Sequence, residues 1–158
     1  MSAVQRVCLS CGRCCDGSIF THANFKEHDY NNSDLINYFP EIKSQKFLSL
    51  PCRLFTSKCP VYNETRPQIC QTFKCRVLHN IENGIYGEAR AEELVAMLHN
   101  LVGEYRQKFE IFQNFDDNLS LSENHEALLN NKKVRKAVHV QLQFATLKFF
   151  IKKHFEKN

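Results

Sequence analysis

Eight cysteines in the first half of the chain are the residues whose type and spacing could do chemistry. They are Cys8, Cys11, Cys14, Cys15, Cys52, Cys59, Cys70 and Cys75. The first three recur at steps of three, so two CxxC turns share Cys11, and a CxxC turn directs two thiolates at one ion. Reduced thiols at this density predict a metal site, with all eight cysteines as candidate ligands.

Two kinds of metal centre fit this set. Four cysteines hold one tetrahedral zinc ion, so eight would fill two such sites. The run of three cysteines also opens the bacterial ferredoxin pattern, in which thiolates bind an iron–sulfur cluster. We expect an iron–sulfur cluster or zinc and prefer iron–sulfur. We also expect one centre to be shared by Cys8, Cys11 and Cys14 with Cys59 or Cys70. His22, His28 and His79 are the near candidates to replace a thiolate.

Two neighbours of this pattern have open roles. Cys15 directly follows Cys14 and does not easily reach the same ion, so it binds a second metal, pairs with a distant cysteine or stays a reactive thiol. Arg66 pairs either with a negatively charged thiolate cluster or with the carboxylate of Glu64 or Asp16.

The beginning of the sequence bears on the state of the thiols. Residues 1–8 contain no apolar run of the kind found in a secretory signal peptide. We therefore expect a cytoplasmic protein with reduced thiols rather than an exported one with four disulfides. No stretch approaches the roughly 20 apolar residues of a membrane span, so no membrane partner is expected.

Composition divides the chain into two parts. All cysteines and all four prolines lie before residue 76, which is typical of a loop-rich segment organised by ligands. Residues 47–50 and 53–55 are predicted to form a small antiparallel pair of strands, and residues 34–39 a short helix that ends at Pro40. We expect an α+β protein. Its domains are a metal-binding module at 1–80 and a helical region at 81–158 that packs on the module as one folding unit.

The second part shows helical periodicity. Apolar residues from Ala91 to Phe112 recur at steps of three and four, which predicts an amphipathic helix. A shorter helix is expected after Ser122 as its cap. A last helix is expected over residues 132–155, and a turn at 80–88. For the buried side of the last helix the candidates are Val134, Val138, Leu142, Ala145, Phe149 and either Ile151 or Phe150.

Charge is separated along the same part of the chain. Residues 82–126 carry ten acids and three bases, whereas residues 132–158 carry eight bases and one acid. Packing the blocks against each other would balance them, so we expect a helix pair. A nucleic-acid partner of the basic block is the alternative, although no nucleic-acid-reading motif accompanies it. A protein partner is also compatible with this composition.

A longer pattern contains all eight cysteines. It reads Cys8-x2-Cys11-x2-Cys14-Cys15, then Cys52, then Cys59-Pro60-x-Tyr62-x3-Arg66-Pro67-x2-Cys70-x2-Phe73-x-Cys75. Over residues 8–75 this order resembles the CxxCxxCC family of zinc- or iron-chelating proteins, the YkgJ-type cysteine-cluster proteins. The resemblance implies that all eight cysteines are ligands and that Tyr62, Arg66, Pro67 and Phe73 form the motif framework. Gln71 departs from the Arg that is usual after that cysteine.

The resemblance leaves the activity unassigned. The same module occurs in flagellin lysine N-methylase, which implies a possible role in lysine methylation or a related modification. This chain has no Gly-rich nucleotide-binding loop, so that activity is not carried over. The alternatives are a redox protein with an iron–sulfur cluster and a structural zinc module that mediates protein or nucleic-acid interaction.

Overall fold

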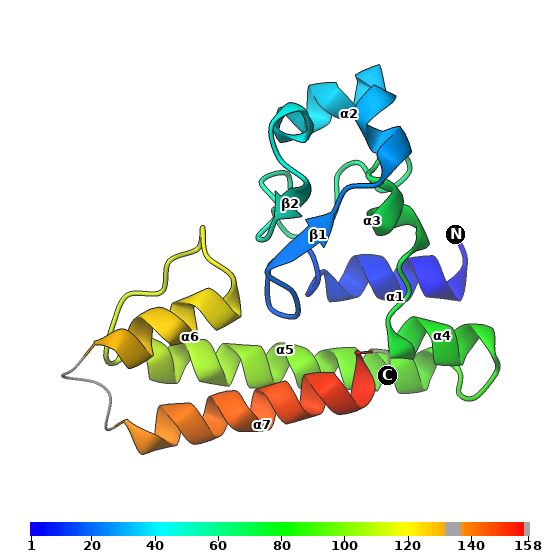
Figure 1. Ribbon diagram of the computed structural model, residues 1–158. Coiled ribbons are helices and arrows are strands. Elements are labelled where there is room, and N and C mark those ends of the chain that lie inside the picture. Colours follow the sequence, from blue (N-terminus) through cyan, green and yellow to red (C-terminus); the bar gives the residue numbers. More distant parts are fainter. Residues whose placement is uncertain (132–136, 157–158) are drawn as a thin grey trace.

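The computed structural model describes residues 1–131 and 137–156 and has a helical base beneath a smaller lobe (Figure 1). The base contains α1 (Ala3–Cys11), α4 (Arg76–Glu82), α5 (Glu88–Glu110), α6 (Leu121–Asn130) and α7 (Val138–His154). The lobe contains β1 (His22–Asn24), α2 (Ser33–Tyr38), β2 (Phe47–Ser49), α3 (Gln68–Thr72) and two 3-10 turns, η1 (Glu27–Asn31) and η2 (Pro40–Lys43). Helices with one small antiparallel sheet make this an α+β fold, as expected.

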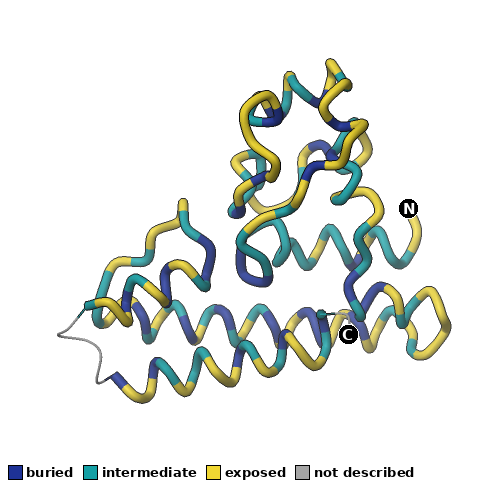
Figure 2. The backbone as a smooth tube through the Cα atoms, viewed as in Figure 1, coloured by how far each residue is buried: buried dark blue, intermediate teal, exposed yellow. Residues whose placement is uncertain are grey.

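Two hydrophobic cores underlie this division (Figure 2). The larger core joins α1, α4, α5, α6 and α7, and its most buried large side chains include Tyr105 and Phe109. The smaller core lies in the lobe, where Phe25, Leu35 and Leu48 pack together. Phe20 packs against both cores. The chain therefore buries its apolar residues in two places that meet near the cysteines.

The sheet of the lobe differs from the predicted one. Strand β2 forms where residues 47–50 predict it, but its partner is β1, paired antiparallel with Ala23 opposite Leu48. Residues 53–55 form a turn instead of a strand. Leu48 is 2% exposed while its neighbours Phe47 and Ser49 face solvent, so the strand has the expected alternation. Helix α2 ends just before Pro40, as predicted.

Helix α1 carries two of the cysteines and was not predicted. Its first turn is closed by a capping box, in which Ser2 Oγ accepts from the Gln5 N–H and Gln5 Oε1 accepts from the Ser2 N–H at 2.8 Å. It ends at Gly12, whose φ of +63° is the left-handed conformation that glycine adopts without strain. Cys8 and Cys11 are therefore one helical turn apart on one face, rather than on two chained loops.

The long helix and its packing partner follow the predicted pattern. Helix α5 covers the periodic residues from Ala91 onward and lies beside α7 (Figure 1). Gln143 links the two helices, because it accepts from Lys108 Nζ at 2.8 Å and donates to Glu104 Oε2 at 3.0 Å. The predicted helix pair is thus confirmed. Glu104 and Lys108 both belong to α5, so this link joins the helices through an amide and not through a pair of opposite charges. The predicted turn at 80–88 begins later, because α4 continues to Glu82.

The buried face of α7 is not the predicted one. Its buried residues are Val140, Leu147 and Ile151, whereas Val138, Leu142 and Phe149 are 60%, 63% and 68% exposed. Both triplets repeat at helical spacing, so periodicity alone selects neither. Of the residues predicted for this face, Ile151 is confirmed, and Val134 lies outside the described residues.

The cap of α6 is Ser120, two residues before the predicted Ser122. Ser120 is fully buried, its hydroxyl accepts from the Glu123 N–H, and Glu123 Oε2 accepts from the Ser120 N–H at 2.8 Å. We expect Ser120→Ala to lower the free energy of unfolding by about 1–2 kcal/mol, because the cap and its reciprocal bond are lost together. Urea unfolding would measure the change. Ser122→Ala, inside the same helix, is the matched control, and an equal loss there would contradict this cap.

Within the described parts of the chain, none of the helices combines the length and the apolar character that crossing a bilayer requires.

Candidate metal centre

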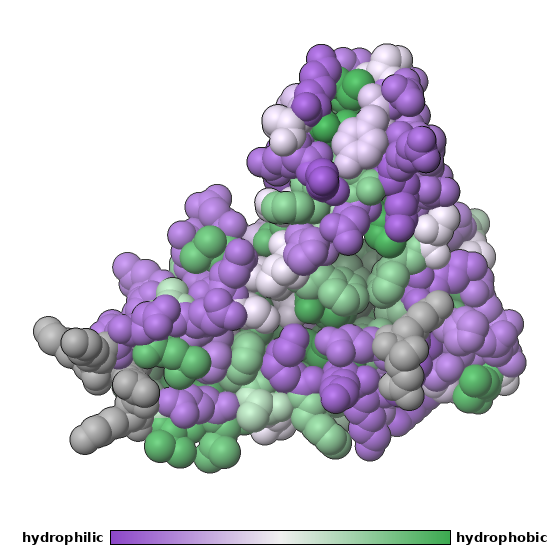
Figure 3. All heavy atoms as spheres, in the orientation of Figure 1, coloured by the Kyte–Doolittle hydropathy of each residue, from purple (hydrophilic) through white to green (hydrophobic). Residues whose placement is uncertain are grey.

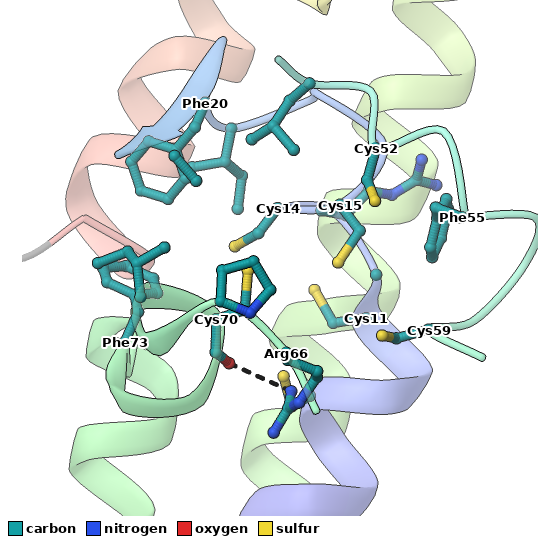
Figure 4. Close-up of a pocket in the computed structure, with 18 of the residues that line it drawn as sticks. Cys11, Cys14, Cys15, Phe20, Cys52, Phe55, Cys59, Arg66, Cys70 and Phe73 are labelled. Carbon is teal, nitrogen blue, oxygen red and sulfur yellow. Dashed lines mark hydrogen bonds between the residues drawn. The ribbon is translucent and has the colours of Figure 1, made fainter. Parts of the chain in front are cut away.

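All eight cysteines line one cavity between the base and the lobe (Figure 4). The cavity has a volume of about 300 Å³ and is otherwise mostly apolar. Its wall also contains the four framework residues of the sequence motif, Tyr62, Arg66, Pro67 and Phe73. Apolar side chains gather around the junction of the base and the lobe (Figure 3). The eight cysteines therefore border one common cavity.

The thiols are free and surround the cavity. None of the eight cysteines forms a disulfide. Among residues 1–131 and 137–156, no three Cys, His, Asp or Glu side chains stand at the mutual distances that hold a single ion. The sulfur atoms labelled in Figure 4 lie around the space rather than at one point.

Four cysteines lie in or against the larger core, and we call them the first cysteine set: Cys8, Cys11, Cys14 and Cys75. Cys75 is 8% exposed and is part of that core, and the other three pack against it. Burial raises the pKa of Cys11 to about 12, and the charges of Cys75 and Cys8 contribute after it. Burial likewise raises the pKa of Cys14 well above its usual value, and the charges of Cys11 and Cys75 raise it further. Core packing places Cys75 beside this set, whereas the charge of Cys59 is the cysteine charge that acts on Cys8, so the expectation that Cys59 or Cys70 completes the centre stays a prediction.

The other four are the second cysteine set: Cys15, Cys52, Cys59 and Cys70. Cys52 and Cys59 pack against the smaller core. The Cys52 N–H donates to the Cys15 carbonyl at 2.7 Å, which ties the two segments together. Burial raises the pKa of Cys15, with further contributions from Cys59, Cys70 and Cys52 in that order. The cysteine charges that act most strongly on Cys15 are therefore those of the second set, and that of Cys8 comes after them.

A distant carboxylate positions Cys70. Cys70 lies in α3, whose first residue follows Pro67, a cap without a side-chain hydrogen bond. Asp29 supplies the missing acceptor, because its Oδ1 accepts from the Gln68 N–H at 3.0 Å while Oδ2 accepts from the Lys26 N–H at 2.8 Å. Asp29 is 1% exposed. Its role follows from a contact across 39 residues, and nothing in the local sequence indicated it.

Gly12 and Phe55 form one wall of the cavity. A Cβ atom at position 12 would lie 2.6 Å from the Phe55 ring, so only glycine allows this approach. Phe55 was not predicted as a site residue. Glycine at position 12 thus serves both the left-handed backbone at the end of α1 and the ring packed upon it.

Tyr62 and Arg66 form a stacked pair beside the thiols. The Arg66 guanidinium carbon lies 4.2 Å from the centre of the Tyr62 ring, and Nη1 donates to the Cys70 carbonyl at 3.2 Å (Figure 4). Burial raises the pKa of Cys8, whereas a hydrogen bond with Tyr62 and the charge of Arg66 lower it. The carboxylates considered for Arg66 have other partners, since Asp16 pairs with Arg13 at 2.6 Å and Glu64 accepts from the Tyr38 hydroxyl at 2.5 Å.

The histidines near the cysteines have different positions. His22 lines the cavity. His28 is more than half exposed and lies 3.4 Å from Asp29, and His79 lies on α4 and does not line the cavity. Of the three candidates, only His22 lies where it could approach a ligand set.

The structure thus gathers the eight thiols of the sequence pattern around one cavity. The model of the CxxCxxCC family, described as a "putative zinc- or iron-chelating domain", matches residues 7–96. The match covers more than half of the chain and all eight cysteines, and the chain belongs to this family. The description agrees with the expected cofactors, zinc or iron. Comparison with curated proteins and with solved structures finds no match.

Proposed function

We propose that this protein binds iron as an iron–sulfur centre through all eight cysteines. The observation that carries the proposal is the placement of all eight thiols around one cavity of about 300 Å³. A zinc ion draws its sulfur ligands to about 2.3 Å and needs no space of its own, whereas a cluster of several irons and sulfides does. The size of this cavity, which other side chains line together with the thiols, supports the larger group.

The residues present fit such a centre. Soft thiolates are the ligands that both iron–sulfur clusters and zinc take. Burial raises the pKa of most of these thiols, so a cation is needed to hold them deprotonated in this apolar site. A centre bound here would supply one-electron transfer. The chain binds and orients it, and Val7, Ile19 and Leu50 help to exclude water from it.

The two cysteine sets are the proposed ligand groups. The first set would hold one part of the metal against the larger core, and the second set would hold the other against the smaller core. Eight thiolates also satisfy two tetrahedral zinc sites without remainder. Two zinc ions that join the lobe to the base are the second candidate, and the same packing supports them.

The surroundings of the centre complete the proposal. Reduced thiols persist in the cytoplasm, and we place the protein there. We also propose that the module at 1–80 and the helical region at 81–158 form one folding unit. The larger core supports a single folding unit, because Val7, Ile19 and Cys75 of the module pack in it with residues of α5 and α7.

Anaerobic purification followed by metal analysis and a visible spectrum tests the proposal. We expect a brown protein that contains iron and acid-labile sulfide. A colourless protein with two equivalents of zinc would replace the iron–sulfur centre by the second candidate. A folded protein free of both metals and indifferent to chelators would overturn the assignment of the cysteines as ligands.

A further inference from the structure

Two arginines line the cysteine cavity with an N–H group that has no acceptor. In the part of the chain that the structure describes, the buried side-chain nitrogen and oxygen atoms without a hydrogen-bond partner are Arg13 Nε and Arg66 Nε. Both residues line the cavity. A buried donor without an acceptor costs about 1–3 kcal/mol, so two such groups at one cavity indicate an acceptor that occupies it.

The remaining bonds of each guanidinium fix where its Nε lies. Arg13 Nη1 donates to Asp16 Oδ2 at 2.6 Å, and the side chain of Arg13 is 18% exposed. Arg66 stacks on Tyr62 and donates from Nη1 to the Cys70 carbonyl. The Gln71 side chain donates to the Arg66 carbonyl at 2.6 Å and holds its backbone. Each arginine is therefore held in place by its neighbours, and its Nε is left for another partner.

The charge of a metal–thiolate centre supplies that partner. Four thiolates outweigh the charge of one Zn²⁺ ion, and thiolate-bound iron–sulfur centres are stabilised by hydrogen bonds to their sulfurs. Arg13 lies in the first cysteine loop between Cys11 and Cys14, and Arg66 lies near Cys8 and Cys70, one from each set. The two positive charges are thus distributed over both ligand groups.

We infer that Arg13 and Arg66 are positioning residues that donate from Nε to sulfur atoms of the bound centre and offset its negative charge. The inference rests on the proposed function and deepens it. It holds for iron–sulfur or zinc, because both place sulfur acceptors and excess negative charge in the cavity. It assigns the arginine of the sequence motif to the thiolate centre rather than to a carboxylate.

The test compares the rate at which the loaded protein releases metal to a chelator. For Arg13→Gln and Arg66→Gln we expect release at least about tenfold faster than for the wild type, as the loss of one charge-assisted hydrogen bond implies. The Lys variants keep the charge but lose the Nε donor, so we expect intermediate rates. Arg90→Gln is the control with the same change of charge, because Arg90 is exposed and pairs with Glu93 on α5.

A second measurement separates this role from a general loss of stability. If the centre contains iron, both Gln variants should have a lower reduction potential, because a positive charge near the centre favours the reduced form. The potential of Arg90→Gln should equal that of the wild type. If a Gln variant does not fold, its Lys variant carries the comparison.

The outcomes distinguish the two proposals. Release rates of the Gln variants equal to those of the wild type and Arg90→Gln would overturn the inference and leave metal binding intact. Lys variants that release metal at the wild-type rate would overturn the role of Nε as a hydrogen-bond donor to the centre. A wild-type protein without bound metal would overturn the inference together with the proposed function.

Discussion

Replacing Cys75 with Ala is expected to remove the same share of metal, about half, as replacing Cys11 or Cys14, because the first cysteine set shares one core. The second set should lose the other half when Cys15 or Cys52 is replaced. Elemental analysis of each purified variant per mole of chain measures both shares. Cys14→Ala and Cys15→Ala form the sharpest comparison, since these neighbours lie in different sets.

Combining variants tests the grouping without relying on absolute metal content. Two replacements within one set should remove no more metal than one, whereas one replacement in each set should remove nearly all of it. If Cys75→Ala combined with other variants as a member of the second set does, and Cys59→Ala as a member of the first, these two cysteines would have to exchange sets. Full metal content in Cys75→Ala, with Cys59→Ala behaving like Cys11→Ala, would favour the grouping expected from the sequence.

Replacing Phe155 with Ala is expected to lower the free energy of unfolding by about 3–5 kcal/mol, the range for deletion of a buried aromatic ring. Phe155 is 1% exposed, belongs to the larger core and also lines the cysteine cavity. Its carbonyl accepts from the Arg76 N–H at 3.0 Å, next to Cys75. Urea unfolding of the metal-loaded protein measures the loss. The same variant should release metal faster, because one wall of the cavity is opened.

Phe149→Ala, inside α7, provides the matched control for Phe155, which directly follows that helix. Phe149 is 68% exposed, so its removal should change stability by about 0.5 kcal/mol or less. Similar losses for the two variants would contradict the assigned face of α7. If Phe155→Ala lowers the free energy of unfolding but keeps the wild-type rate of metal release, metal binding by the cysteine module would be independent of the packing of the helical region.

The elements that could be predicted are those whose signal lies within a short stretch of sequence. The type and spacing of the eight cysteines predict a metal site, and an apolar face repeated over several turns predicts α5. Helix α1 was not predicted because it is short and its apolar stripe, Val4, Val7, Cys8 and Cys11, includes two cysteines that were interpreted as ligands on turns. The face of α7 was wrong because apolar residues repeat on two of its sides.

Other parts of the site depend on contacts between distant segments. The partner of β2 is three residues, His22–Asn24, a segment too short for its alternation to indicate a strand. Asp29 reaches α3, Phe55 reaches Gly12, and Phe155 returns from the far end of the chain to the cysteines. Each role arises only when the fold has brought the segments together, so no local pattern indicated it. The packing of Cys75 near Cys8, Cys11 and Cys14 likewise depends on distant segments that the fold brings together.

The position of the cysteine cavity between two separate cores has a consequence for the amount of protein a cell maintains. A ligand that binds only the folded state shifts the folding equilibrium by mass action. Metal held at the junction would stabilise the attachment of the lobe to the base, beyond what either core contributes alone. The abundance of the mature protein would then rise and fall with the supply of its metal, through turnover of unloaded chains and without a dedicated sensor.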